Sequence, residues 1–262
     1  MIDMHCHFLP GLDDGPDNLD EALEMARIAV ADGIRFAVLT PHIEPGRYDN
    51  DRERIRTQFE AYRHALHAAG IPLRVAMASE VRLDLRVVPM FGREEVPFVG
   101  VTGGYEIVLL ELPPNHVPVG AARFIERLVR QRIRPLLAHP ERNDEIMRDP
   151  AKLSPLLSAG SFIQINAGSL TGAFGRGVRR RARQLLELEV FKVLASDAHD
   201  TVRRRPELRA AADIAAGIIG PLAAQALVYE NPAAIVFGKR LTRRRLDRHS
   251  LRAAGLDLQS NA

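Results

Sequence analysis

Cysteine and tryptophan are almost missing from this chain. Among its 262 residues Cys6 is the single cysteine, there is no tryptophan, and aromatic residues make up only 5%. One cysteine excludes an internal disulfide and is typical of a reducing compartment, so we expect a cytoplasmic protein. We predict no signal peptide, because the first residues include neither a basic stretch nor a long apolar stretch. No apolar run approaches the length of a membrane-spanning helix.

Lysine is scarce as well. Lys152, Lys192 and Lys239 are the only lysines, so 33 of the 36 basic residues are arginine, and the net charge is +3. Arginine binds phosphate through two parallel hydrogen bonds, although a GC-rich genome produces the same bias. The hydrophobic fraction of 46% is sufficient for a large core and excludes a disordered chain.

Short β-like runs alternate with amphipathic stretches along the chain, which predicts a parallel sheet, either flat or closed into a barrel. Asn18 and Asn50 have the residue type and position expected of caps for the first two helices. We expect one domain over residues 1–240, followed by a basic tail over 241–262 that frays. The predicted strands are 2–7, 34–40, 73–79, 106–111, 134–138, 161–166 and 190–196, and the predicted helices are 19–32, 51–69, 118–132, 176–188 and roughly 205–217.

Metal-competent side chains follow six of the seven predicted strands. In a barrel of alternating strands and helices, the carboxyl ends of the strands meet at one rim, where active sites lie. On a strand, residues i and i+2 point to the same face, so the pair His5 and His7 can bind one ion. The full set of candidates is His5, His7, Asp14, His42, Glu80, Glu111, His139, Asp197 and His199.

This set has five imidazoles and four carboxylates. One divalent ion takes roughly four to six ligands, so nine protein ligands are suited to two or three ions. Three such ions would leave a residual positive charge that attracts an anion, and they would lower the pKa of a bound water. The pattern therefore favours hydrolysis of phosphate esters.

Five segments carry a resemblance to a known group of proteins. "HCHFLPGLDDG", "TPH", "LAHPER", "INAGSLTG" and "SDAH…RP" resemble the polymerase and histidinol phosphatase (PHP) superfamily. More narrowly, they resemble its bacterial protein-tyrosine phosphatases of capsule and exopolysaccharide synthesis, over about residues 1–240. The resemblance implies a distorted seven-stranded (β/α) barrel, with the nine candidates above as ligands of a trinuclear centre that usually holds manganese, with iron, cobalt or zinc as other options.

The resemblance also implies which residues contact the substrate. Arg142, and an arginine just before Pro206, match positions that contact phosphate in the family, and we assign the second role to Arg205 from the run Arg203–Arg205. The proton for the leaving phenolate would come from His42 or from a metal-bound water. The implied partner is a phosphotyrosine protein, namely a membrane-associated bacterial tyrosine kinase with an acidic, tyrosine-rich tail.

Cysteine-dependent tyrosine phosphatases need an arginine at a fixed distance after the nucleophile. The corresponding position after Cys6 is Leu12, so a thiolate mechanism is excluded and Cys6 is expected to be a packing residue. A binuclear amidohydrolase also begins with the HxH pattern, but it generally uses a carboxylated lysine at a strand end, and neither Lys152 nor Lys192 lies at one.

Two further interpretations stay open. The same metals would serve a phosphatase of histidinol phosphate or another small phosphomonoester. From a different class, the arginine runs at 176–183 and 239–245 are compatible with an inactive barrel that binds nucleic acid. The low aromatic content and the complete set of candidate ligands disfavour that last interpretation.

Overall fold

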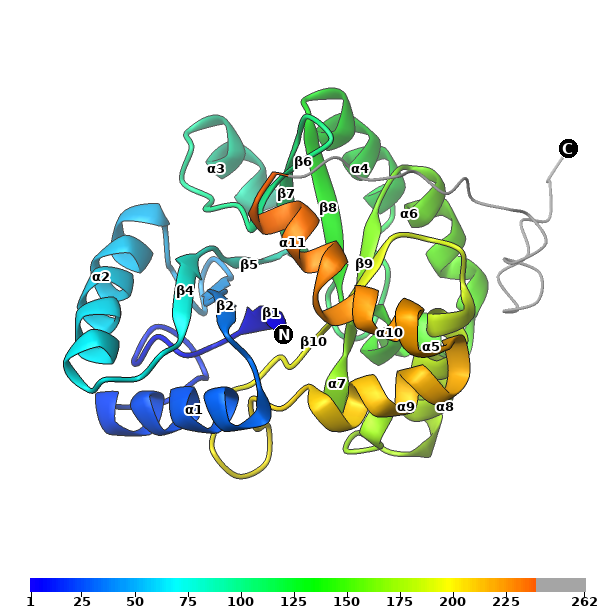
Figure 1. The fold of residues 1–262 in the computed structure, drawn as a ribbon. Coiled ribbons are helices and arrows are strands. Elements are labelled where there is room, and N and C mark those ends of the chain that lie inside the picture. The colour runs from blue at the N-terminus through cyan, green and yellow to red at the C-terminus, as the bar shows by residue number, and fades with distance from the viewer. Residues whose placement is uncertain (239–262) are drawn as a thin grey trace, which may run out of the picture.

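The computed structural model describes residues 1–238, and these form a seven-stranded barrel surrounded by helices (Figure 1). Two of the seven barrel strands are each broken into two pieces, and all neighbouring barrel strands are parallel. In order around the barrel they are β1 (Ile2–Cys6), β2 (Phe36–Leu39) with β3 (His42–Ile43), β4 (Arg74–Met77) with β5 (Glu80–Arg82), β7 (Tyr105–Glu111), β8 (Ile133–Ala138), β9 (Phe162–Asn166) and β10 (Lys192–Ala195).

Hydrogen bonds between β1 and the residues that follow β10 join the two edges of the sheet. Asp197 N donates to His5 O at 2.8 Å, and His7 N donates to Ala198 O at 2.8 Å. Beneath them, Asp3 Oδ2 accepts from Ser196 Oγ at 2.5 Å. The expected distorted (β/α) barrel is therefore confirmed. The barrel is distorted where β2 passes into β3 and where β4 passes into β5. Pro41 lies at the first of these breaks and has no N–H to donate to a neighbouring strand. Its carbonyl still accepts a hydrogen bond from Glu80 N.

The five predicted helices are present, with small shifts at their ends. They are α1 (Leu19–Asp32), α2 (Arg52–Ala68), α4 (Ala121–Arg130), α8 (Arg176–Glu187) and α9 (Arg209–Ile219). Asn18 caps α1 as predicted. The predicted cap of α2 was wrong: Asp51 accepts from Arg54 N, while the Asn50 amide is buried and donates to the carbonyls of Leu12 and His42.

Several elements were not predicted. The strand β6 (Gly100–Thr102) pairs antiparallel with β7 through a turn in which Gly103 and Gly104 both have positive φ, at 59° and 79°. A Gly-Gly pair between two apolar runs is a hairpin signal. The remaining helices are α3 (Val88–Gly92), α5 (Asp144–Arg148), α6 (Ser154–Ser158), α7 (Ala167–Thr171), α10 (Pro221–Val228) and α11 (Glu230–Val236), and single 3₁₀ turns span Leu85–Val87, Pro140–Arg142 and Pro150–Leu153.

The core has an inner and an outer layer. Met4, Leu109 and Val193 belong to the buried cluster inside the barrel, and Ile235 from α11 joins them. A Cβ on Gly100 would lie 2.5 Å from Ile235 O, so α11 can approach β6 only because residue 100 is glycine. The larger apolar cluster fills the space between the strands and the surrounding helices. Among the described residues, no helix combines the length and apolar character needed to cross a membrane.

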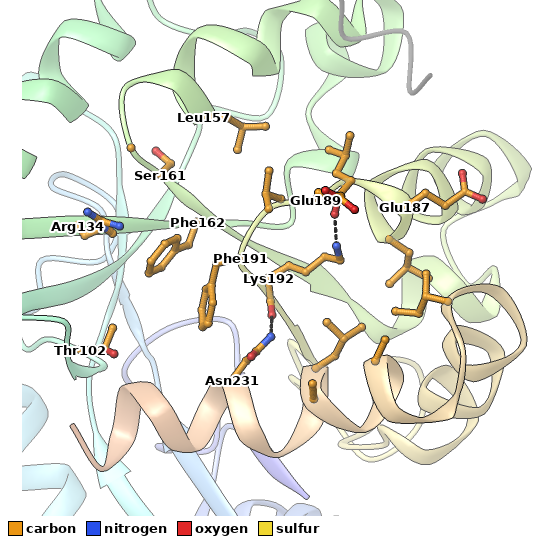
Figure 2. A pocket seen from close by; sticks show the side chains of 18 of the residues that line it. Thr102, Arg134, Leu157, Ser161, Phe162, Glu187, Glu189, Phe191, Lys192 and Asn231 are labelled. Carbon is orange, nitrogen blue, oxygen red and sulfur yellow. Dashed lines mark hydrogen bonds between the residues drawn. The ribbon is translucent and has the colours of Figure 1, made fainter. Parts of the chain in front are cut away.

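A cavity of about 1290 Å³ lies beside the amino-terminal ends of the strands (Figure 2). Arg134 stacks between the rings of Tyr105 and Phe162 on one wall. On another, Lys192 Nζ donates to Leu188 O, and Asn231 Nδ2 donates to Lys192 O at 2.8 Å. None of the nine candidate residues lines this cavity, so it is separate from the opposite rim, where the polar side chains gather.

Candidate metal centre

The nine candidate residues converge at the carboxyl-terminal rim of the barrel. Eight of them form three overlapping groups. Within each group, the potential ligand atoms all lie within 4.8 Å of one another. The ninth, His139, reaches the same place, with Nε2 3.2 Å from Glu80 Oε1. The three groups are His7, Asp14, His42 and His199; His5, His7, Glu80 and Asp197; and His42, Glu80 and Glu111.

Glu80 lies at the middle of the site. It is fully buried, and its Oε2 is 3.2 Å from His5 Nε2, 3.4 Å from His7 Nε2 and 3.1 Å from His42 Nδ1. Burial opposes ionisation, but the charges of His5 and His42 outweigh it and hold the pKa of Glu80 well below its usual range. Glu80 is therefore an ionised carboxylate that faces histidines from two different barrel strands.

Asp197 forms the second anionic position. Its Oδ1 lies 3.2 Å from His5 Nε2 and 3.6 Å from His7 Nε2. Burial opposes ionisation here too, yet the pKa of Asp197 is lowered, because His5 and Arg204 stabilise the carboxylate. Asp197 adopts a positive φ of 53°, which is uncommon outside glycine, so the backbone is held in a costly conformation at this point.

The outer part of the site consists of Asp14 and His199. Asp14 Oδ1 lies 3.3 Å from His199 Nε2 and 3.4 Å from His42 Nε2. Burial and the proximity of His7 lower the pKa of His199 to about 4, so that its imidazole is neutral at pH 7, as a metal ligand must be. Glu111, on the far side of Glu80, has a raised pKa because it is buried and close to Glu80.

The donor set fits divalent cations. Within the described part of the chain, several of its buried atoms form no hydrogen bond, among them His42 Nδ1, Glu80 Oε1 and Oε2, Asp197 Oδ1 and His199 Nε2. Buried polar atoms that form no hydrogen bond are energetically costly, and a cluster of them that face one another from different strands is what a cation bound between them would stabilise. Mixed imidazole and carboxylate ligands are typical of Zn²⁺, Mn²⁺, Fe²⁺ and Co²⁺.

Two arginines reach the metal centre. Arg142 Nη1 donates to Asp197 Oδ2 at 2.8 Å, and its guanidinium lies 4.2 Å above the ring centre of Phe174. Arg204 Nη2 lies 2.5 Å from the same oxygen. Both side chains are partly exposed, so their outer N–H groups face the rim.

The structure places Arg204, and not the predicted Arg205, beside the candidate metal ligands. Arg205 Nε donates to Glu207 Oε1 on the surface, away from the ligands. The reason lies in the preceding turn, in which Asp200 Oδ1 accepts from Arg204 N, and Arg204 O accepts from His199 N. This turn folds Arg204 back over Asp197, and the next residue consequently points outward.

Sequence reasoning missed two residues whose buried side chains contact the candidate histidines. Asp13 Oδ2 lies 2.6 Å from His7 Nδ1, and Gln164 Oε1 lies 3.1 Å from His5 Nδ1. Asp13 stands next to Asp14 in "LDDG", so the doubled aspartate was its only signal. Gln164 is a polar residue between Ile163 and Ile165 in the buried strand β9, which is the signal that could have identified it.

Cys6 is not part of the site. It is fully buried, its Sγ is 3.5 Å from Val38 O, and it lies in the apolar cluster outside the barrel interior. Burial raises the pKa of its thiol well above the usual value, the opposite of what a nucleophilic thiolate requires.

Fold and site together define a hydrolase of the barrel class with a buried cluster of metal-competent side chains. Within residues 1–238 the lysines are Lys152, which pairs with Glu145, and Lys192, at the amino-terminal start of β10. Neither can supply the carboxylated lysine of the amidohydrolase interpretation. The centre consists of histidines and carboxylates only.

The chain belongs to the CpsB/CapC family of capsular polysaccharide synthesis, whose model matches residues 1–237. It is 36% identical over 204 residues to the tyrosine-protein phosphatase YwqE of Bacillus subtilis, which covers 78% of this chain and 79% of that protein. It is also 26% identical over 241 residues to the tyrosine-protein phosphatase CpsB of Streptococcus pneumoniae, which covers 90% of this chain and 98% of the other.

Solved structures agree with the family. A structure from work on YwqE of Bacillus subtilis and CpsB of Streptococcus pneumoniae, described as unique metal-dependent tyrosine phosphatases, has a TM-score of 0.85 at 32% identity and covers 94% of this chain and 97% of that one. An organophosphorus hydrolase mutant has a TM-score of 0.54 at 16% identity over 89% of this chain and 91% of that one, a likeness of fold alone.

Proposed function

We propose that this protein is a metal-dependent phosphatase that hydrolyses phosphotyrosine on proteins. The observation that carries the proposal is the meeting of nine metal-competent side chains with two arginines at one rim of the barrel. Family membership and the names of the relatives support the same activity. The activity is that of a phosphoric monoester hydrolase without a cysteine nucleophile.

The chain's own residues would bind and orient the phosphate. Divalent cations held by the nine residues would act as Lewis acids on the phosphoryl group and lower the pKa of water. Arg142 and Arg204 carry N–H groups that can pair with two phosphate oxygens, and this stabilisation grows as negative charge builds up on those oxygens in the transition state. Asp197 and Phe174 hold Arg142 in place before the substrate binds.

His42 is better suited to metal binding than to proton donation. Its Nδ1 lies 3.1 Å from Glu80 Oε2, and its Nε2 lies 3.4 Å from Asp14 Oδ1, so both ring nitrogens face candidate ligands. The outer face of the ring stacks against Tyr48 at 5.5 Å. We therefore infer that water, rather than His42, protonates the leaving phenolate.

A substrate panel tests the proposal. The purified protein, loaded with Mn²⁺, is assayed on a phosphotyrosine peptide, a phosphoserine peptide of the same sequence and histidinol phosphate. We expect kcat/KM to be highest for phosphotyrosine by at least tenfold. A preference for histidinol phosphate would overturn the proposal in favour of a small-molecule phosphatase, and the absence of any turnover would favour a regulatory barrel.

The finer details of the proposal concern metal, partner and compartment. We propose two or three ions per chain, with manganese as the working metal and iron, cobalt or zinc as alternatives. The proposed partner is a membrane-associated tyrosine kinase with an acidic, tyrosine-rich tail, met in the cytoplasm.

The arginine runs do not require the nucleic-acid interpretation. On α8 the arginines of the run 176–183 lie mostly on an exposed helix face, which is usual for charged residues in the absence of any nucleic acid. The run 239–245 lies outside the described residues, as does the proposed tail 241–262.

A further inference from the structure

Two single oxygen atoms each contact two of the candidate histidines. Asp13 Oδ2 lies 2.6 Å from His7 Nδ1 and accepts from His42 N at 2.9 Å. Gln164 Oε1 lies 3.1 Å from His5 Nδ1 and accepts from His139 N at 3.0 Å. In both cases one contact is the ring of a histidine on or just after β1. The other is the backbone N–H of a histidine from a different barrel strand, because His42 begins β3 and His139 follows β8.

We infer that Asp13 and Gln164 are paired positioning residues, which fix the ring tautomers of His7 and His5 and set the place of His42 and His139. The inference rests on the proposed metal-dependent function. Neither residue is in the ligand set, and neither side chain reaches the rim, because both are fully buried. Their effect on metals would be exerted entirely through the histidines that they contact.

The backbone N–H groups decide the chemistry of these contacts. A backbone N–H is always a donor, so the atom of Gln164 that faces His139 N must be its carbonyl oxygen and not its amide nitrogen. An oxygen that only accepts requires a proton on His5 Nδ1, and in the neutral ring that binds a metal the lone pair is then on Nε2. The carboxylate of Asp13 imposes the same tautomer on His7.

The fixed tautomers point both lone pairs at the metal centre. His5 Nε2 and His7 Nε2 lie 3.1 Å apart, and both face Glu80 and Asp197. Two lone pairs at that distance repel one another unless a cation lies between them and the carboxylates. The two oxygens therefore preorganise the HxH pair for metal and against a direct hydrogen bond between the rings.

The second contact of each oxygen is a hydrogen bond from a backbone N–H, and it fixes the backbone at His42 or at His139. His139 has φ of +29°, in the left-handed region that a side chain disfavours. The hydrogen bond from its N–H to Gln164 helps to offset that strain and places the imidazole beside Glu80.

Metal binding without turnover tests the inference. Apoprotein is titrated with Co²⁺, and the dissociation constants and visible absorption are measured for wild type, Gln164→Leu and Gln164→Glu, with Ser161→Ala as a matched control just before the same strand. Gln164→Leu removes the acceptor and should weaken binding of at least one ion by about 10- to 100-fold and change the spectrum. Gln164→Glu keeps an acceptor oxygen and should stay within a few-fold of wild type.

Asp13 is tested in the same way, with Asp13→Ala against Asp13→Asn and with Asp17→Asn as the control on the exposed part of the loop.

Equal binding and equal spectra for Gln164→Leu and wild type would overturn the inference. So would a loss of binding in Gln164→Glu as large as that in Gln164→Leu, because the acceptor would then not be the relevant feature. Because no substrate is used, these outcomes are independent of whether the protein acts on phosphotyrosine.

Discussion

Arg142 and Arg204 meet at one oxygen atom, Oδ2 of Asp197, although they are 62 positions apart in the sequence. Asp197 also contacts His5 through its other oxygen, at 3.2 Å. One carboxylate thus aligns the two guanidinium groups with the metal centre. The arrangement places two cationic, partly exposed forks beside the position that a phosphate would take.

The arginine pair leads to the first prediction. Arg142→Ala and Arg204→Ala should each keep the bound metals but lower kcat/KM on a phosphotyrosine peptide by about 100-fold, equivalent to roughly 2.7 kcal/mol of transition-state stabilisation. Arg205→Ala is the matched control, because its surface pair with Glu207 should be worth about 0–1 kcal/mol of stability and nothing in turnover. Near-wild-type kinetics for Arg204→Ala, or a large loss for Arg205→Ala, would contradict the placement. Metal content is measured on the same samples.

Removal of metal should abolish activity. Because the site consists of imidazoles and carboxylates without a nucleophilic side chain, prolonged incubation with excess EDTA should reduce turnover to background, and Mn²⁺ should restore it better than Mg²⁺ or Ca²⁺, which prefer all-oxygen sites. The same treatment should lower the melting temperature, since metals that bind only the folded state stabilise it. Turnover that persists after the metals have been shown to be absent would exclude the mechanism.

Cys6 should be dispensable for turnover. Cys6→Ser should keep kcat within a few-fold of wild type, because the side chain packs away from the ligands and a serine hydroxyl can still donate to Val38 O. Some loss of stability is expected from a hydroxyl in an apolar site. A fall in kcat by orders of magnitude with unchanged metal content would mean that the thiol takes part in the reaction.

Glu141 should make the stability of the metal-free protein depend on pH. Burial raises its pKa from 4.5 to about 7, and it accepts from Asn166 N at 2.8 Å. The neutral form is the one that the fold favours, so its contribution is complete below pH 4.5 and is lost as pH rises towards 7. The loss is on the order of 3 kcal/mol.

Glu141→Gln keeps the acceptor and has no proton to lose, which makes it the test of this pH dependence. Urea unfolding of both proteins in EDTA should give a stability difference that grows in favour of the variant between pH 4.5 and 7 and then levels off. Other titrating groups are common to both proteins and cancel in the difference. A difference that does not change with pH would show that Glu141 is ionised throughout.

The ligand set could be read from the sequence because a parallel barrel brings all strand ends to one rim. His5, His139 and Asp197 each follow or end an apolar run, so their convergence needed only the alternation of strands and helices. Side-chain directions in loops could not be read in the same way. The choice between Arg204 and Arg205 depends on a turn held by the Asp200 carboxylate, and no pattern of residue types specifies which side chain that turn presents.

The supporting residues were hidden for a different reason. Gln164 has its effect through one atom shared between His5 and His139, which are far away in the sequence. Asp13 could not be distinguished from its neighbour Asp14 by residue type. Only the conformation of the loop after β1 shows that Asp13 faces His7 Nδ1 and that Asp14 faces the rim. Contacts of this kind depend on three-dimensional register, which propensity and periodicity do not encode.

The closure of the barrel between β1 and the residues after β10 has a consequence for biosynthesis. Asp3 and Ser196, which bond to one another at this seam, are 193 positions apart. Contacts of such long range form late, because the entropy of closing the intervening loop must first be overcome. Until Asp197 and His199 have been synthesised, His5 and His7 lack these two candidate partners. The complete centre can therefore form only after the chain has been made beyond residue 199, and chains truncated before residue 197 would have neither the complete centre nor the closed barrel.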